Sequence, residues 1–168
     1  MTPTVDLDSV AIAVRLGAAL LAGAIIGIDR ELKNKPAGLR THSMVSIGAA
    51  IVVLATIASS QGAPDAVSRA IQGIITGIGF LGAGVIMQYE HERRIEGLTT
   101  AASIWVAAGL GIACGAGLVE LVGIAMLAAI LVLVGGNWIE GAINRRSQGK
   151  PPDAPPDGDR RHGDRRRK

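Results

Sequence analysis

Five long apolar stretches, separated by short polar gaps, occupy most of the chain. A helix needs about 20 mostly apolar residues to cross the hydrocarbon core of a bilayer, with a working range of ~17–25. The polar faces that recur at helical spacing in soluble amphipathic helices are almost absent here. The stretches are residues 10–28, 43–60, 70–87, 98–115 and 118–138. The pattern predicts an all-α membrane protein whose five transmembrane helices form one domain over residues 10–138.

The basic residues of the gaps predict how these helices are oriented. Lys and Arg gather in the first gap, residues 29–42, and in the third, residues 88–97, whereas the second gap has only Arg69 and the fourth has none. Basic residues of short loops stay on the cytoplasmic side of a membrane. We therefore expect residues 1–9 to form a short periplasmic N-terminus and the C-terminus to lie in the cytoplasm.

The last segment, residues 147–168, differs in composition from the rest. Four prolines stand between positions 150 and 156, and the remainder is nearly all charge and glycine. Such a segment buries too little apolar surface to offset the entropy lost on ordering. We predict a disordered basic cytoplasmic tail, and beside five spans its charge favours anionic lipid headgroups over nucleic acid as the partner.

Glycine makes up 23 of the 168 residues, and most of it lies within the apolar stretches. Helices in lipid associate by close packing across small residues, so these glycines predict a tight bundle or contacts between copies of the chain. The third stretch is the most glycine-rich, and it is either an intact helix in a deep groove between neighbours or a helix broken at mid-membrane. The predicted packing residues are Gly23, Gly27, Gly73, Gly77, Gly79, Gly82, Gly84, Gly111 and Gly115.

A weak internal similarity appears at an offset of 59 residues. Gly23-Ala24 matches Gly82-Ala83, and Gly38-Leu39-Arg40-Thr41 matches Gly97-Leu98-Thr99-Thr100. The matched spans run in the same direction through the membrane. This predicts a parallel repeat of two helical hairpins, followed by a fifth helix.

Polar residues within the spans are few, and they bear directly on function. Arg15 lies clearly inside the first span, where it either reaches the outer headgroups or serves an internal role, and Glu120 lies at a comparable depth. Cys114 is interpreted as a small packing residue, and Gln72 and Thr76 are the deep polar groups of the third span. His42 is interpreted as a solvated loop residue.

Acidic residues are missing from the middle of every span. Magnesium is bound through carboxylate oxygens with retained water, so the pattern gives poor support to a dedicated divalent-cation carrier. The run from Gly77 to Gly82 has the spacing of a dinucleotide-binding turn, but it lies within an apolar span and is interpreted as helix packing. We predict no catalytic residue, no metal site and no cofactor.

Four motifs in order resemble the MgtC/SapB family of bacterial inner-membrane proteins. They are Gly27-Ile28-Asp29-Arg30-Glu31, Ala37-Gly38-Leu39-Arg40-Thr41-His42, the run Gly77 to Gly84 after Arg69, and Gly97-Leu98-Thr99-Thr100-Ala101-Ala102 with Trp105. The resemblance covers about residues 10–136. The family-motif residues at the inner face are Asp29, Arg30, Glu31, Gly38, Arg40, Thr41, Gly97, Thr99 and Thr100.

The resemblance implies a multi-pass protein of the bacterial inner membrane that is linked to growth under low magnesium. It implies a regulator, not an enzyme, and the best-known member is thought to restrain the ATP synthase through its membrane sector. Many members continue into a folded cytoplasmic domain, in place of which this chain has its basic tail, as a short form would. The hypothesis is therefore a non-enzymatic regulator that contacts lipid and another inner-membrane complex. The alternative is a transporter or channel for Mg²⁺ or another small ion.

Overall fold

Five helices form the whole of the secondary structure in the described part of the chain. The structure is a computed structural model that describes residues 8–60, 63–87 and 97–147, with only the backbone described for Met87 and residues 137–147. Each helix is long and apolar enough to cross a membrane, which confirms the predicted all-α membrane fold. The helices are α1 (Ser9–Leu32), α2 (Leu39–Ser59), α3 (Pro64–Met87), α4 (Leu98–Ala116) and α5 (Val119–Ser147).

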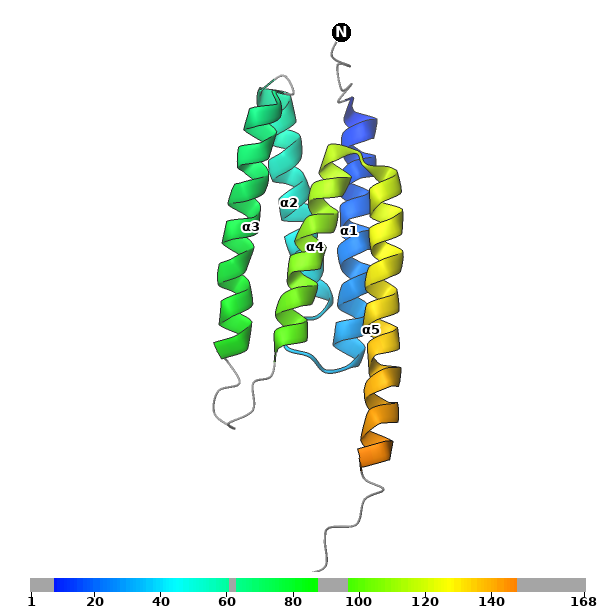
Figure 1. The fold of residues 1–168 in the computed structure, drawn as a ribbon. Coiled ribbons are helices and arrows are strands. Elements are labelled where there is room, and N and C mark those ends of the chain that lie inside the picture. Colours follow the sequence, from blue (N-terminus) through cyan, green and yellow to red (C-terminus); the bar gives the residue numbers. More distant parts are fainter. Residues whose placement is uncertain (1–7, 61–62, 88–96, 148–168) are drawn as a thin grey trace, which may run out of the picture.

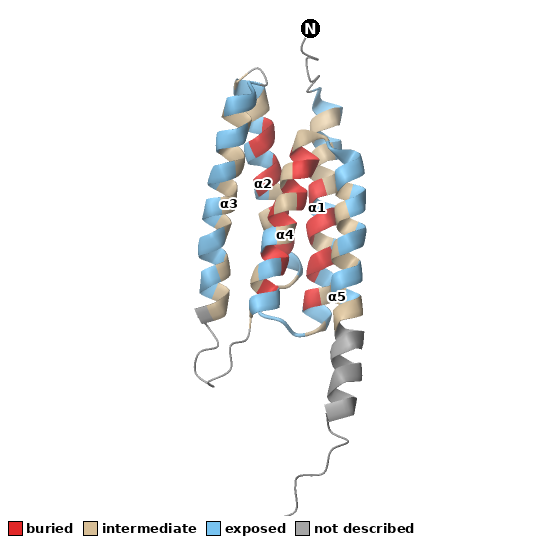
Figure 2. Ribbon diagram, in the orientation of Figure 1, coloured by how far each residue is buried: buried red, intermediate tan, exposed pale blue. Residues whose placement is uncertain are grey.

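The helices α1, α2 and α4 form the centre of the bundle, and α3 and α5 flank them on opposite sides (Figure 1). Every buried residue of the described helices lies on the three central helices, while α3 and α5 have only exposed and half-buried positions (Figure 2). Small residues dominate the core, since a central cluster comprises Ala19, Ala22, Ile26, Ala50, Leu110 and Cys114. The bundle is therefore a tightly packed three-helix core with two loosely attached helices.

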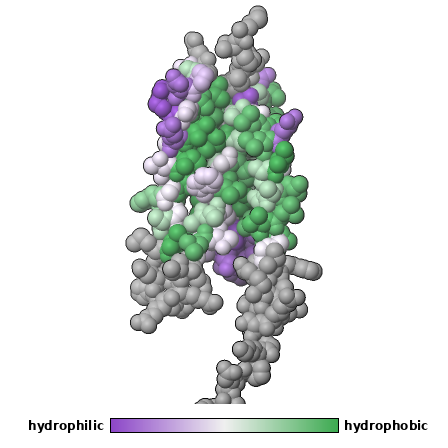
Figure 3. Space-filling view, in the orientation of Figure 1, coloured by the Kyte–Doolittle hydropathy of each residue, from purple (hydrophilic) through white to green (hydrophobic). Residues whose placement is uncertain are grey.

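The surface of the bundle has the polarity of a membrane-spanning protein. Hydrophobic residues cover the middle of the face drawn in Figure 3, and hydrophilic residues gather toward its two ends. The start of α1 and the end of α5 lie at opposite ends of the bundle (Figure 1). That arrangement agrees with an odd number of spans, while the side that faces the cytoplasm stays a prediction. Residues 1–7 and the predicted tail beyond Ser147 lie outside the described residues.

Helix ends are set by short local signals. Asp8 caps α1, because its carboxylate accepts a hydrogen bond of 2.6 Å from the backbone N–H of Ala11. Gly117 ends α4 in a left-handed conformation with φ +77°. Its N–H donates to the Cys114 carbonyl and the N–H of Leu118 donates to the Ala113 carbonyl, a pair of bonds that closes the last turn of a helix. The turn leaves only two residues between the end of α4 and the start of α5.

Glycines bring α2 into backbone contact with both of its central neighbours. A Cβ atom at Gly23 of α1 would lie 2.5 Å from the His42 carbonyl oxygen, and one at Gly27 would lie 2.6 Å from the Leu39 Cα. On α4, a Cβ at Gly111 would collide with the Ser46 carbonyl oxygen, and one at Gly115 would lie 2.8 Å from the Ala50 carbonyl oxygen. The four glycines therefore fix the distances between the central helices, as small residues do in membrane bundles.

The glycines of α3 behave differently. The helix is continuous from Pro64 to Met87, so the alternative of a broken span is wrong for this structure. The expectation of a deep groove between neighbours is also wrong, because α3 has no buried residue among those described. A Cβ at Gly82 would make ordinary contact with the Ala101 Cβ at 3.6 Å. No atom of the described chain outside the local backbone lies within 4 Å of a Cβ built at Gly73, Gly77, Gly79 or Gly84.

The two hairpins that the sequence relates share one packing register. Gly23 faces His42 in the α1–α2 hairpin, and Gly82 faces Ala101, the position 59 residues after His42, in the α3–α4 hairpin. The N–H of each facing residue also bonds to the carbonyl of the glycine that starts its helix, Gly38 or Gly97. This register supports the interpretation of a repeat. The second hairpin is looser, because Gly82 meets a side chain and not a backbone.

A matched pair of substitutions on α4 tests the role of the backbone contacts. We expect Gly111→Ala to lower the free energy of unfolding by about 1–3 kcal/mol, because the added methyl group overpacks a contact with the α2 backbone. The control Gly109→Ala adds the same methyl group where no atom lies within 4 Å, so stability should be unchanged or slightly higher. Equilibrium unfolding in mild detergent with added denaturing detergent measures both. Equal stability of the two variants would contradict this account.

Candidate functional site

The candidate site is a cluster of polar side chains at the end of the bundle that carries the α1–α2 loop. Arg30, in the last turn of α1, is only 4% exposed, although it carries a permanent charge. Its guanidinium Nη2 donates a hydrogen bond of 2.8 Å to the Oγ1 of Thr100 on α4. The Nε of Arg30 has no partner among the described residues. The motif residues Arg30 and Thr100 are thus in direct contact across the bundle.

His42 extends this cluster onto α2. Its ring is fully buried, with Nδ1 2.8 Å from the Gly38 carbonyl and Nε2 2.9 Å from the Ser103 hydroxyl. A carbonyl oxygen only accepts, so Nδ1 carries the proton, and in the neutral ring Nε2 accepts from Ser103. The Ser103 hydroxyl also lies 2.8 Å from the Thr100 carbonyl, which is its alternative acceptor. The prediction of His42 as a solvated loop residue is therefore wrong, because α2 begins three residues before it and turns the ring inward.

Spacing on α2 explains how these polar groups become buried. The buried positions of α2 recur at helical spacing and include His42, Ser46, Ala50 and Val53. Polar side chains thus continue the same stripe that small apolar residues occupy farther along the helix. Ser46 is fully buried, and its hydroxyl has no partner among the described residues. In the sequence, the recurrence of small residues at this spacing is the signal that places His42 and Ser46 on the buried face of α2.

The two acidic motif residues lie at the end of α1, and one of them, Glu31, ties this end to the start of α2. The Glu31 carboxylate accepts a hydrogen bond of 2.9 Å from the N–H of Leu39, the first residue of α2. A carboxylate at a helix N-terminus satisfies an otherwise unpaired donor and interacts favourably with the helix dipole. Gly38 leaves room for it, since a Cβ there would collide with the Glu31 carboxylate. Asp29 pairs with Lys33 at 2.7 Å, which is the one ion pair within the described residues.

The remaining motif residues lie outside this cluster. Arg40, Thr41 and Thr99 are exposed, so the structure does not bring them to Arg30 and His42. Gly97 starts α4 with φ +92°, a left-handed conformation that favours glycine, close to the backbone of Val85. The motifs therefore contain a buried set that links three helices and an exposed set at the same end of the bundle.

Arg15 lies toward the opposite end of the bundle. Its guanidinium donates a hydrogen bond of 3.0 Å to the Gly115 carbonyl and lies against Gly117, so it neutralises the C-terminal end of α4. The structure thus gives Arg15 an internal role with a partner other than Glu120, with which it forms no ion pair. Cys114 is a buried free thiol in the core beside it.

Gln72 and Thr76 do not join either polar region. Both are exposed on α3 and bond within their own helix, where the Thr76 hydroxyl donates to the Gln72 carbonyl at 2.8 Å. The three intramembrane groups Arg15, Gln72 and Thr76 therefore do not converge on a common path within the described chain.

The buried cluster supplies hydroxyl groups, one imidazole and one guanidinium. Hard divalent cations prefer an array of oxygen ligands with carboxylates among them, and a buried guanidinium opposes the approach of a cation. No group of three or more His, Cys, Asp or Glu residues that could hold a metal occurs in the part of the chain that the structure describes. The arrangement is suited to holding three helix ends in one register.

A comparison with protein families settles the class of the protein. The model of the MgtC family matches residues 16–142, a segment that contains the whole buried cluster and most of all five helices. The chain belongs to the MgtC family. It is a multi-pass membrane protein of that family, and the predicted resemblance is confirmed.

Individual relatives of the MgtC family agree with this assignment. SrpB of Synechococcus elongatus is 42% identical over 111 residues, which cover 60% of this chain and 61% of SrpB. MgtC of Salmonella typhimurium is 44% identical over 95 residues, covering 56% of this chain and 39% of that protein. SapB of Bacillus subtilis is 42% identical over 104 residues, covering 58% and 44%. The chain thus spans less than two thirds of each relative, and no solved structure matches it.

Neighbouring threonines on α4 test the buried cluster. We expect Thr100→Val to destabilise the fold by about 1–3 kcal/mol, because it leaves the buried Arg30 donor without its acceptor at nearly constant side-chain volume. The control Thr99→Val changes the same group at an exposed position and should shift stability by no more than about 0.5 kcal/mol. Unfolding in detergent measures both. A Thr100→Val variant as stable as the Thr99→Val variant would show that the Arg30 contact contributes nothing.

Proposed function

We propose that this MgtC-family protein is a non-enzymatic regulator in magnesium or envelope homeostasis in the bacterial inner membrane. It acts through lateral contact between its helices and another membrane complex. The family resemblance makes the membrane sector of the ATP synthase the first candidate for that complex. The observation that carries the proposal is the open glycine surface of α3.

This surface combines exposed glycines with a hollow. Helical spacing places Gly73, Gly77 and Gly84 on one face of α3, and a Cβ atom built at any of the three would have no atom of a neighbouring described helix within 4 Å. A groove of about 420 Å³ lies between α2 and α3, and Gly48, Gly73 and Gly77 are among its lining residues. Glycines on both walls allow the backbone of a further helix to approach closely.

Small residues matter more here than apolar area. Lipid tails are as apolar as the helix surface, so helices in a bilayer gain association energy mainly from close packing and interhelical hydrogen bonds. The glycines of α1 and α4 already serve this purpose within the chain, at Gly23, Gly27, Gly111 and Gly115. The equivalent pattern on α3 has no partner in the described chain, which supports a partner outside it.

The end of the bundle that carries the buried cluster supports the proposal in a second way. The Arg30–Thr100 and His42–Ser103 contacts hold the three central helices at one end, and Arg40 is exposed near the start of α2 at the same end. A fixed end next to an open helix face lets a partner helix dock in one register. The transport alternative predicts a polar path along the bundle, whereas the core between Arg15 and Arg30 is formed by residues such as Ala19, Ala22 and Ile26.

A matched pair of glycine substitutions tests the proposed contact. Tagged protein in mild detergent should recover a membrane complex, and Gly77→Leu should reduce that recovery at least roughly tenfold, as the loss of a well-packed interface anchor does. Gly123→Leu on α5 adds the same side chain at another exposed glycine with no neighbour within 4 Å, and it should leave recovery unchanged. Gly23 and Gly27 are unsuitable for this purpose, because leucine there would disrupt the α1–α2 packing.

Other outcomes of these experiments would contradict the proposed contact or favour a transporter. Recovery of the same complex by the wild type and by Gly77→Leu would contradict the α3 contact, and recovery of the protein alone in every case would contradict lateral regulation. Protein-dependent flux of divalent cations or protons in proteoliposomes would favour the transporter. Complementation of a deletion strain in low magnesium by Gly123→Leu, but not by Gly77→Leu, would connect the surface to the cellular role.

A further inference from the structure

A second groove, on the other flank of the bundle, lies between α4 and α5. Its volume is about 480 Å³, and small residues form much of its lining: Ala102, Gly109, Ala113, Ala125, Ala128 and Ala129. Ile26 of α1 contributes to the same lining. Small side chains on both walls widen the hollow between the adjacent helices, and larger residues such as Trp105, Leu121 and Val132 complete its lining.

The groove is longer than the hydrocarbon layer of one leaflet is thick. On α4 it extends from Thr99 to Ala113, which corresponds to roughly 21 Å at the rise of an α-helix. One leaflet contributes about half of the ~30 Å hydrocarbon core. A lipid acyl chain that enters at the Thr99 end therefore stays within the groove across the whole hydrocarbon layer of that leaflet.

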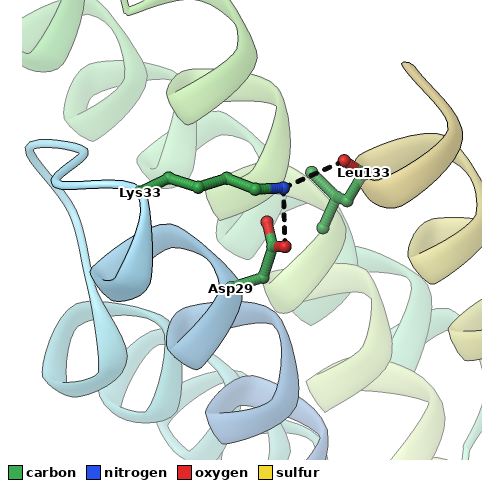
Figure 4. Close-up of polar contacts among 3 residues, drawn as sticks. All are labelled: Asp29, Lys33 and Leu133. Atoms are coloured by element: carbon green, nitrogen blue, oxygen red, sulfur yellow. Dashed lines mark hydrogen bonds and ion pairs between the residues drawn. The ribbon is translucent and has the colours of Figure 1, made fainter. Parts of the chain in front are cut away.

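The Thr99 end of the groove lies beside residues 29–35, which hold three basic and two acidic side chains. Leu133 lines the groove, and its carbonyl accepts a hydrogen bond of 3.1 Å from the Nζ of Lys33, which also pairs with Asp29 at 2.7 Å (Figure 4). An ammonium group has three N–H donors, so these contacts use two of them. The Lys33 side chain is 31% exposed. Lys33 therefore places a partly exposed side chain, with one further N–H donor, where the apolar groove ends.

We propose that this groove binds an anionic glycerophospholipid, with one acyl chain between α4 and α5 and the phosphate group on Lys33. Basic groups at the membrane surface attract anionic headgroups. Lys35 is exposed two residues farther along the same loop and adds to the positive field. The predicted orientation places this end in the cytoplasmic leaflet.

Charge favours lipid over a further helix as the occupant. An apolar helix seated in the groove would take the Lys33–Asp29 ion pair out of water, and desolvating an ion pair is costly. A lipid phosphate adds a hydrogen-bond acceptor for Lys33 and leaves the ion pair at the hydrated interface. The inference is independent of the α3 contact, because α3 and α5 lie on opposite flanks (Figure 1).

Spin-labelled lipids test the site on the full chain. The protein is placed in phosphatidylcholine bilayers with a small amount of chain-labelled phosphatidylglycerol or phosphatidylcholine, and electron paramagnetic resonance measures the motionally restricted fraction. Phosphatidylglycerol should be preferred by roughly fivefold, the factor that one lysine contributes at a membrane surface. Lys33→Gln should abolish the preference, whereas Lys33→Arg should retain it.

Matched controls separate this site from general surface charge. Lys35→Gln removes the same charge from an exposed loop position and should retain most of the preference. Ala128→Leu fills the groove and should abolish the preference, whereas Ala13→Leu, on an exposed face of α1, should not. Helical content by circular dichroism confirms that each variant is folded.

Three results would overturn the proposal. They are an equal restricted fraction for both lipids with the wild type, an equal loss from Lys33→Gln and Lys35→Gln, and an unchanged preference in Ala128→Leu. A dimer in light scattering, with no lipid preference, would show that a second copy occupies the groove instead.

Discussion

The fold depends on the contact between the backbone of α2 and the backbones of α1 and α4. In a bilayer no hydrophobic gain accompanies helix association, so the central helices are held by contacts that only glycine permits. Gly23 and Gly27 admit the start of α2, and Gly111 and Gly115 admit its middle. A side chain at any of these positions would meet backbone atoms, which cannot move as a flexible side chain does. The same four contacts set the spacing of the three helices that carry the buried polar cluster.

The buried polar cluster follows from that spacing. The His42 carbonyl lies against Gly23, and this close approach places the imidazole ring beside Ser103 of α4. Arg30 lies on α1 at the depth of Thr100, so its guanidinium donates a hydrogen bond to a hydroxyl group and not to a carboxylate. A partly paired charge of this kind is costly to bury, and it persists because the surrounding helices are fixed by the glycine contacts. The hydrogen bonds of the buried cluster at this end of the bundle therefore depend on the glycine contacts between the helices.

Much of the fold could be predicted from the sequence, because the length and polarity of a membrane-spanning helix leave little choice. The pairing of the helices could not. Gly23 and Gly27, Gly73 and Gly77, and Gly111 and Gly115 share one spacing, yet the first and third pairs contact α2 while the second faces open space. Their local sequence does not encode which of these faces meets a neighbour. The burial of His42 could not be predicted for a related reason, since its position beside the charged gap gives no sign that α2 begins at Leu39.

The contrast between the centre and the flanks of the bundle links structure to function. If all the small residues served internal packing, the surface toward the bilayer would be smooth. Here the described parts of α3 and α5 have no buried position, and both helices leave hollows beside them. The two hollows differ chemically. The one beside α3 is lined by glycine on both walls, which suits the backbone of another helix, and the one beside α5 ends at an ammonium group, which suits a phosphate. The proposed partner and the proposed lipid therefore occupy opposite flanks of the same three-helix core.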